Sequence, residues 1–228
     1  IDNMSNSELL AQLQASFIGC KTEYPTVDGK RGPRVYMDSA ASTLMMAPAY
    51  EVGHEFLTHY ASTHSDLHYA ARGASHAFEW AHDKVLEFVD ANPEQYCSFF
   101  AGSGATAGFN RMAASLSRAR PERSIVLISE MEHHSNDLPH RHHNAQVVHV
   151  PCMGEFERYG GLDMDRLREI FEEHGDKINY IAVTGASNVT GAITPLGEVA
   201  KLAHAVGAYL IVDASQMIAH APVSMDQA

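Results

Sequence analysis

Five short β-rich apolar runs alternate with helical patterns from about residue 80 onward, and this alternation constrains the fold more than any other feature. Most of the runs are continuous rather than alternating in polarity, which is typical of strands buried on both faces of a sheet. Strands separated by helices indicate a parallel sheet with right-handed crossovers. The sequence therefore predicts an α/β fold. The predicted strands are Cys97–Phe100, Ile125–Ile128, Val147–Val150, Tyr180–Val183 and Tyr209–Val212.

The predicted helices carry recognisable start and stop signals. Asp163 is placed to cap one helix that ends at Gly175, and Thr194 to cap another that has Pro195 at its first position and ends at Gly207. Residues 1–35 read as an N-terminal arm that leads into the body of the fold. The other predicted helices are Asn6–Ile18, Ser75–Asp90 and Ala105–Ala119.

Polar or glycine-rich segments follow four of the five predicted strands at their carboxyl ends, where open parallel sheets bind ligands. Ala101–Thr106 runs into a helix, so its backbone N–H groups can approach an anion and the Thr106 hydroxyl can add a donor. A plain glycine-rich turn would look similar. The segment has neither the Gly-Lys-Ser/Thr of a P-loop nor the spacing of a Rossmann dinucleotide site.

Histidines gather after the second predicted strand, beginning with the adjacent pair His133 and His134. Neighbouring residues on a helix point about 100° apart, so an adjacent pair chelates a metal poorly. His64 and His68 have better metal spacing elsewhere in the chain. We expect no metal site, most of the 15 histidines to be solvent-exposed, and one imidazole of the pair to stack on a planar ring.

The last two polar segments follow the fourth and fifth predicted strands. Ser187–Gly191 offers an amide at the sheet edge, although a simple turn would also explain it. Asp213 ends an apolar strand, where a carboxylate costs desolvation unless a positive or hydrogen-bonding group faces it. The protonated ring nitrogen of a ligand would satisfy this residue; a turn cap or a distant arginine are the alternatives.

Composition narrows the partners and the compartment. The net charge of −12 argues against nucleic acid. No apolar run reaches the roughly 18 residues that would span a bilayer, so we expect no membrane segment. Three widely spaced cysteines favour a reducing, cytoplasmic compartment.

Together these segments resemble the class V aminotransferase family of fold-type-I pyridoxal-phosphate (PLP) enzymes, within it the cysteine desulfurase and selenocysteine lyase branch. Order and spacing agree over roughly residues 36–226, and five matches in register are far more specific than one. The matching segments are Tyr36–Ser42, Gly104–Thr106, Glu130–Asn136, Ser187–Gly191 and Val212–Gln216, with His220 after the last.

The resemblance implies a three-layer fold-type-I large domain over residues 36–228, with PLP as the cofactor. Asp213 would pair with the pyridinium nitrogen, and His133 would be the catalytic residue that stacks on the ring, with His134 as the second choice. The remaining implied roles are ring-hydroxyl contacts from Asn188 and Gln216, phosphate contacts from Ala105 and Thr106, and a substrate-side turn at Ala40 and Ala41.

Two departures from the branch concern its specificity. Ser103–Thr106 stands where the branch often has Arg-Gly-Thr-Thr, and His64–His68 stands where it often has His-Arg-Gly-Ile-His.

The family's Schiff-base lysine would lie roughly a dozen residues beyond Ala228. The five lysines present, namely Lys21, Lys30, Lys84, Lys177 and Lys201, do not fit that role. We therefore expect a fragment of a longer enzyme that also lacks the C-terminal small domain and is inactive alone.

The resemblance implies a PLP enzyme acting on an amino acid, with desulfuration of cysteine as the first choice. An aminotransferase, epimerase or carbon–sulfur lyase is the alternative within the cofactor class, and a non-catalytic binding subunit is the alternative outside it. A homodimer and a sulfur-acceptor protein are the implied partners.

Overall fold

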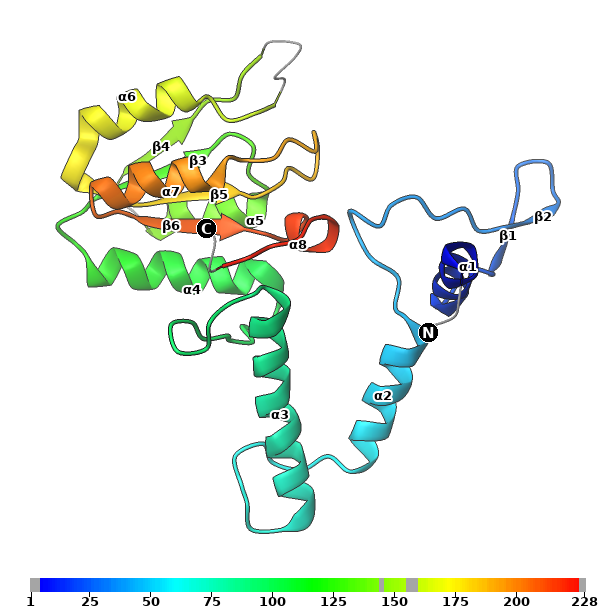
Figure 1. The fold of residues 1–228 in the computed structure, drawn as a ribbon. Helices are drawn as coiled ribbons and strands as arrows, with labels where there is room; N and C mark the ends of the chain where they lie inside the picture. The colour runs from blue at the N-terminus through cyan, green and yellow to red at the C-terminus, as the bar shows by residue number, and fades with distance from the viewer. Residues whose placement is uncertain (1–4, 144–145, 155–159, 226–228) are drawn as a thin grey trace. The chain divides into compact units, whose positions relative to one another are not determined.

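The computed structural model describes residues 5–143, 146–154 and 160–225 (Figure 1). The chain divides into two compact units, Ile1–Ala81 and His82–Ala228. Helix α3 (Tyr69–Phe88) belongs to both, because the division falls within it. Among the described residues, no helix combines the length and the apolar character needed to cross a membrane.

The unit His82–Ala228 is built on a sheet of four parallel strands in the order β4-β3-β5-β6. Every residue of the two central strands is buried, as their continuous apolar sequence predicts. The predicted parallel α/β fold is thus confirmed for four of the five strands. Their bounds are β3 (Ile125–Ser129), β4 (Gln146–Val150), β5 (Ile178–Thr184) and β6 (Tyr209–Asp213).

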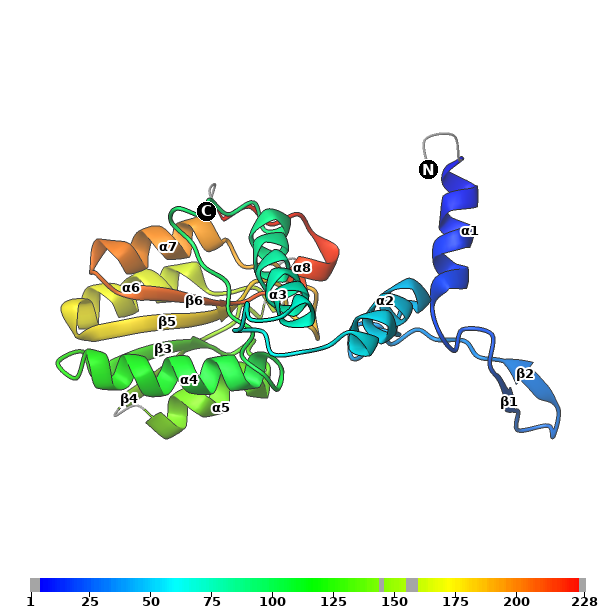
Figure 2. The same cartoon turned by 90° about the horizontal axis from the view of Figure 1, so that it is seen from below.

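Helices cover both faces of this sheet, so the unit has three layers (Figure 2). Alternate residues of β3 point to opposite faces: Leu127 packs in one apolar cluster, and Val126 and Ile128 pack in the other. Helices α6 (Met164–His174) and α7 (Leu196–Ala205) cover the Leu127 face. Helices α4 (Gly104–Ala119) and α5 (His134–His143) cover the opposite face. The short 3₁₀ helix η2 (Gly175–Lys177) and α8 (Met217–His220) complete the unit.

Local signals explain where α6 begins and ends. The Asp163 carboxylate accepts the Arg166 N–H and so caps α6, and Gly175 ends that helix with a φ of 48°. The predicted cap of α7 is wrong by one position, because Pro195 occupies the cap site. Thr194 instead donates its hydroxyl to the Thr184 carbonyl at the end of β5 (2.6 Å).

The predicted strand Cys97–Phe100 does not form. A strand requires a neighbour to accept and donate its main-chain hydrogen bonds, and no described segment pairs with these residues. Ser98 is held by a side chain instead: its carbonyl and hydroxyl lie 2.8 and 2.9 Å from Nδ1 of His82 on α3. Helix α3 also begins six residues earlier than the predicted start at Ser75.

The unit Ile1–Ala81 contains α1 (Asn6–Ser16), the antiparallel pair β1 (Glu23–Pro25) and β2 (Arg31–Pro33), and α2 (Ala47–Thr58). Helix α1 starts with a capping box in which Ser5 and Glu8 bond each other's backbone N–H. No residue of α1 or α2 is buried, and α3 buries only Ala71 and Ala74. This unit therefore leaves much apolar surface exposed.

Candidate functional site

Three neighbouring strands, β3, β5 and β6, end at one edge of the sheet. Thr184 at the end of β5 pairs with Asp213 at the end of β6. Helix α4 runs back along the sheet, so its N-terminus lies at this same edge (Figures 1 and 2). The edge gathers the polar segments that the sequence places after strands, as expected for an open parallel sheet.

Asp213 is an acidic residue at this edge that is nearly buried, with only 4% of its surface exposed. Its Oδ1 accepts hydrogen bonds from the N–H (3.0 Å) and the hydroxyl (2.6 Å) of Ser215. Within the described residues, no lysine, arginine or histidine forms an ion pair with it. A nearly buried carboxylate without a cation favours a positively charged ligand group.

A second carboxyl group, that of the half-buried Glu132, lies close enough for the charge of Asp213 to act on it. Burial raises the pKa of Glu132 to about 7, and Asp213 adds to the rise, against hydrogen bonds from Ser129, Asn136 and Thr184. Two adjoining carboxyls make the edge more favourable for a cation. Glu132 is not among the site residues that the sequence predicts. Its position between a buried strand and the adjacent histidines His133 and His134 is the signal that could have indicated it.

His133 immediately precedes α5 and is exposed. Its Nδ1 accepts the main-chain N–H of Ser135 (3.2 Å) and lies 2.8 Å from the Ser135 hydroxyl. This contact anchors one edge of the imidazole ring and leaves its faces for other contacts. The ring of His134 is tilted by 41° from that of His133, so the two do not present one common surface.

The N-terminus of α4 has no side-chain cap. Gly102 and Gly104 have φ values of +93° and +66°, which side-chain-bearing residues rarely adopt, and space is open where each Cβ would be. Ala105 and Thr106 in the first turn are exposed. First-turn N–H groups without intrahelical partners, together with the helix dipole, suit an anion such as a phosphate.

The other predicted residues are distributed between the two units. Asn188 is exposed in the turn after β5, which the Ser187 hydroxyl braces by accepting the N–H groups of Val189 and Thr190 (both 3.2 Å). Gln216 is half-buried just before α8. Ala40 and Ala41 belong to the other unit, in an exposed turn after β2. The structure thus groups the six predicted cofactor residues in one unit but does not place the two alanines among them.

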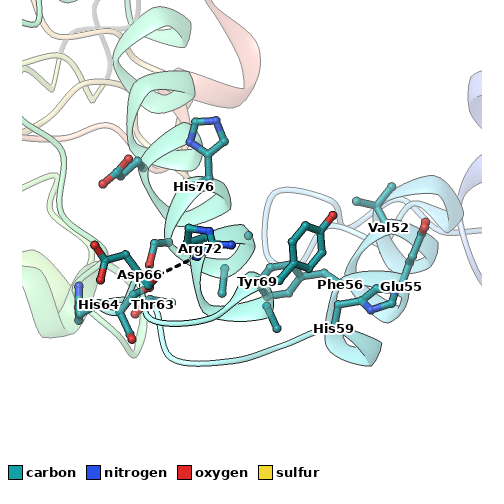
Figure 3. A pocket seen from close by; sticks show the side chains of 16 residues that line it. Val52, Glu55, Phe56, His59, Thr63, His64, Asp66, Tyr69, Arg72 and His76 are labelled. Atoms are coloured by element: carbon teal, nitrogen blue, oxygen red, sulfur yellow. Dashed lines mark hydrogen bonds between the residues drawn. The ribbon is translucent and has the colours of Figure 1, made fainter.

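A separate hollow lies in the unit Ile1–Ala81. It measures about 1250 Å³ and is lined from α2 and the start of α3 by residues such as Phe56, His59 and Tyr69 (Figure 3). Nearby, Arg72 donates to the Asp66 carbonyl (3.0 Å). None of the predicted cofactor residues lines it. A smaller polar hollow of about 380 Å³ at the sheet edge includes Glu132 in its lining.

The histidines with metal spacing are engaged separately. His68 accepts the Ala71 N–H at the start of α3 (3.3 Å), while His64 packs edge-on against Phe78. Across the parts of the chain that the structure describes, no three histidine, cysteine or acidic side chains gather as a metal site would require.

Comparison with known proteins decides the family. The profile of the class-V aminotransferases matches residues 35–228. This chain belongs to the class-V aminotransferase family. The family prediction made from the five sequence segments is therefore confirmed.

Relatives of this class-V chain point to one branch of the family. A cysteine desulfurase of Escherichia coli O7:K1 is 31% identical over 195 residues, covering 85% of this chain and 47% of the relative. A cysteine desulfurase of Dickeya dadantii is 33% identical over 202 residues, covering 85% and 46%. The chain thus spans about half the length of the curated relatives it matches.

A solved structure agrees with these relatives. The crystal structure of a cysteine desulfurase from Escherichia coli superposes with a TM-score of 0.74 and 26% identity, covering 99% of this chain and 52% of that one. An apo cysteine desulfurase from Thermococcus onnurineus, at 24% identity and a TM-score of 0.70, shares the fold. The predicted fold-type-I architecture of this class-V chain is confirmed.

Proposed function

We propose that the protein uses PLP to act on an amino acid, and that removal of sulfur from cysteine is its reaction. The observation that carries the proposal is Asp213, a nearly buried carboxylate at the end of β6 without a cationic partner among the described residues. A protonated pyridine nitrogen supplies the missing positive charge. The named activity of the relatives from Escherichia coli and Dickeya dadantii supports cysteine as the substrate.

The donor set at the sheet edge fits this cofactor. The uncapped N-terminus of α4, with Ala105 and Thr106 in its first turn, is suited to the phosphate. His133 lies after β3 and would stack on the ring, while Asn188 and Gln216, which follow β5 and β6, would contact the ring hydroxyl. When bound, PLP supplies an electron sink for charge that develops at the α-carbon of the substrate.

The chain's own residues would hold and orient this cofactor. Asp213 would keep the ring nitrogen protonated, because its carboxylate is fixed by Ser215 and shielded from water. His133 would stack on the ring, and its neutral form would carry its proton on Nε2, since Nδ1 accepts the N–H of Ser135. We place the cofactor domain at residues 36–228, the arm at residues 1–35 and the substrate-side turn at Ala40 and Ala41.

A homodimer, a sulfur-acceptor protein and a cytoplasmic location complete the proposal. Support for a second copy comes from α2 and its end, where large apolar side chains lie exposed although burying them would be favourable. These residues are Tyr50, Val52, Phe56, Leu57 and Tyr60. The three cysteines are all free thiols, which suits a reducing compartment.

The test uses the full-length protein and its visible absorption spectrum with added PLP, before and after borohydride, followed by mass mapping of the reduced adduct. A visible band that borohydride removes, with pyridoxyl fixed to a lysine, is the expected result. Sulfide release from cysteine then separates desulfuration from transamination, epimerisation or carbon–sulfur lysis. A folded protein that binds no PLP would instead favour a non-catalytic binding subunit.

A further inference from the structure

A continuous chain of buried polar side chains runs between α5 and the sheet, behind the candidate site. Tyr180 on β5 and Asn136 and His140 on α5 are each 0% exposed. The Tyr180 hydroxyl lies 2.8 Å from Nδ1 of His140, and Nε2 of His140 lies 3.0 Å from Oδ1 of Asn136. Nδ2 of Asn136 lies 2.6 Å from Oε2 of Glu132. The chain therefore starts in the core and ends on the carboxyl group beside Asp213.

The direction of each hydrogen bond follows from the chemistry of the members. Burial lowers the pKa of His140 to about 4, with His143 acting in the same direction and Asp137 against it, so the ring is neutral near pH 7. A neutral imidazole has one donor and one acceptor. Asn136 donates from Nδ2 to the Glu132 carboxylate, so its Oδ1 accepts from Nε2–H of His140. Nδ1 is then the acceptor for the Tyr180 hydroxyl.

Glu132 joins this chain directly to two strand ends and, through Thr184, to a third. Its Oε1 accepts the main-chain N–H of Thr184 (2.6 Å) at the end of β5 and the hydroxyl of Ser129 at the end of β3. Thr184 pairs directly with Asp213 on β6. His133 follows Glu132 in the sequence, so the group that anchors the strand ends also anchors the residue proposed to stack on the cofactor.

We propose that Glu132 is a positioning residue that holds His133 against the strand ends beside Asp213, and that the buried chain through Asn136, His140 and Tyr180 holds Glu132 in turn. This inference rests on the proposed PLP site. Glu132 also places a negative charge beside Asp213, so it strengthens the attraction of the edge for a protonated ring nitrogen.

The charged groups around Glu132 determine how this contribution depends on pH. The charge of Asp213 on β6 acts on Glu132. Burial raises the pKa of the Cys152 thiol, which lies just after β4, and the charges of Glu132 and the exposed Glu130 raise it further. The polar contacts of Glu132 come from β3, α5 and β5. Because Glu132 titrates near pH 7, its negative charge is lost on mild acidification.

The test compares Glu132→Gln with the neighbouring exposed control Glu130→Gln in the full-length protein. The dissociation constant of PLP is measured by absorbance titration from pH 6 to 8.5, and ¹⁵N NMR of the histidine rings reports the tautomer of His140. We expect E132Q to bind PLP about fivefold more weakly than wild type at pH 8, with a smaller difference at pH 6. E130Q should follow the wild-type curve.

The NMR readout tests the chain independently of cofactor binding. Wild-type His140 should be neutral with its proton on Nε2. In E132Q the carbonyl of the new glutamine accepts the Thr184 N–H, so its NH₂ group faces Asn136, and the Asn136 amide must turn to accept from it. Nδ2 of Asn136 then donates to Nε2 of His140, which moves the His140 proton to Nδ1 and changes the ring shifts. Equal PLP affinity and pH profile in E132Q and wild type would overturn the inference and leave the PLP site standing. A wild type that binds no PLP would overturn the proposed function itself, whatever the NMR result.

Discussion

The main-chain N–H of Thr184 donates a 2.6 Å hydrogen bond to Oε1 of Glu132, joining the segment after β3 to the end of β5. A carboxyl group that accepts from the backbone of a neighbouring strand holds that strand end in place. Because Thr184 pairs with Asp213, the contact also helps to fix the position of Asp213, on which the proposed cofactor site depends.

The stability of the Glu132→Gln variant, compared with that of wild type, should increase as the pH rises. The folded-state pKa of about 7 lies above the ordinary 4.5, so the folded protein retains a proton that the unfolded chain has lost. The stability linked to that proton is fully present below pH 4.5 and is lost as the pH rises through 7. Urea unfolding at several pH values should show E132Q gaining roughly 2–3 kcal/mol on wild type between pH 4.5 and 7.5. A constant difference across this range would contradict the assignment.

Replacing His140 by Gln should reveal the opposite dependence. Burial lowers the folded-state pKa from 6.5 to about 4, so the unfolded chain binds the proton more readily. The stability linked to neutral His140 is present above pH 6.5 and is lost as the pH falls through 4. Relative to H140Q, wild type should lose stability on acidification over this window.

Wild type combines both effects. Between about pH 4.5 and 6.5 the unfolded chain carries a proton on His140 and none on Glu132, whereas the folded protein carries one on Glu132 and leaves His140 neutral. The two contributions oppose each other there, so wild-type stability should vary less with pH than that of either single variant. A double variant with both residues changed to Gln is the matched control, because neither titrating group remains.

Replacing Asp213 by Asn should abolish most cofactor binding. The amide retains the size of the side chain and can still accept from Ser215, but it carries no charge to balance a protonated ring nitrogen. Losing one partner of a buried ion pair costs about 3 kcal/mol or more, so the PLP dissociation constant should rise by on the order of 100-fold. Fluorescence titration with PLP measures this, and circular dichroism checks the fold. Wild-type affinity in D213N would remove the basis of the PLP assignment.

Replacing Thr106 by Val should weaken binding of the phosphate group alone. The substitution removes one hydroxyl at the exposed first turn of α4 and preserves the shape of the side chain. The loss of one hydrogen bond to a charged group is worth about 1–2 kcal/mol, or roughly tenfold in affinity for PLP. Pyridoxal, which lacks the phosphate, is the matched ligand and should bind both proteins equally. An equal loss for both ligands would place Thr106 away from the phosphate.

Much of the fold follows from local patterns that the sequence displays openly. The continuous apolar runs at Ile125, Tyr180 and Tyr209 predicted strands because a strand between two helical layers needs apolar residues on both faces. Asp163 and Gly175 predicted the bounds of α6 because capping depends on residues within one turn. Cys97–Phe100 has equally good strand residues and forms no strand, because pairing depends on a neighbour that local composition does not reveal.

Some features of the candidate site also follow from the sequence, and others depend on the tertiary structure. The sequence by itself determined which polar residues follow each strand, and with them the family, because parallel topology places those residues at one edge whatever the details of packing. Only the tertiary structure decided that Asp213 is nearly buried, that Glu132 meets Thr184, and that His140 is a neutral core residue rather than one of the exposed histidines. Burial and hydrogen-bond partners set the energy of a charge, and both depend on residues distant in the sequence.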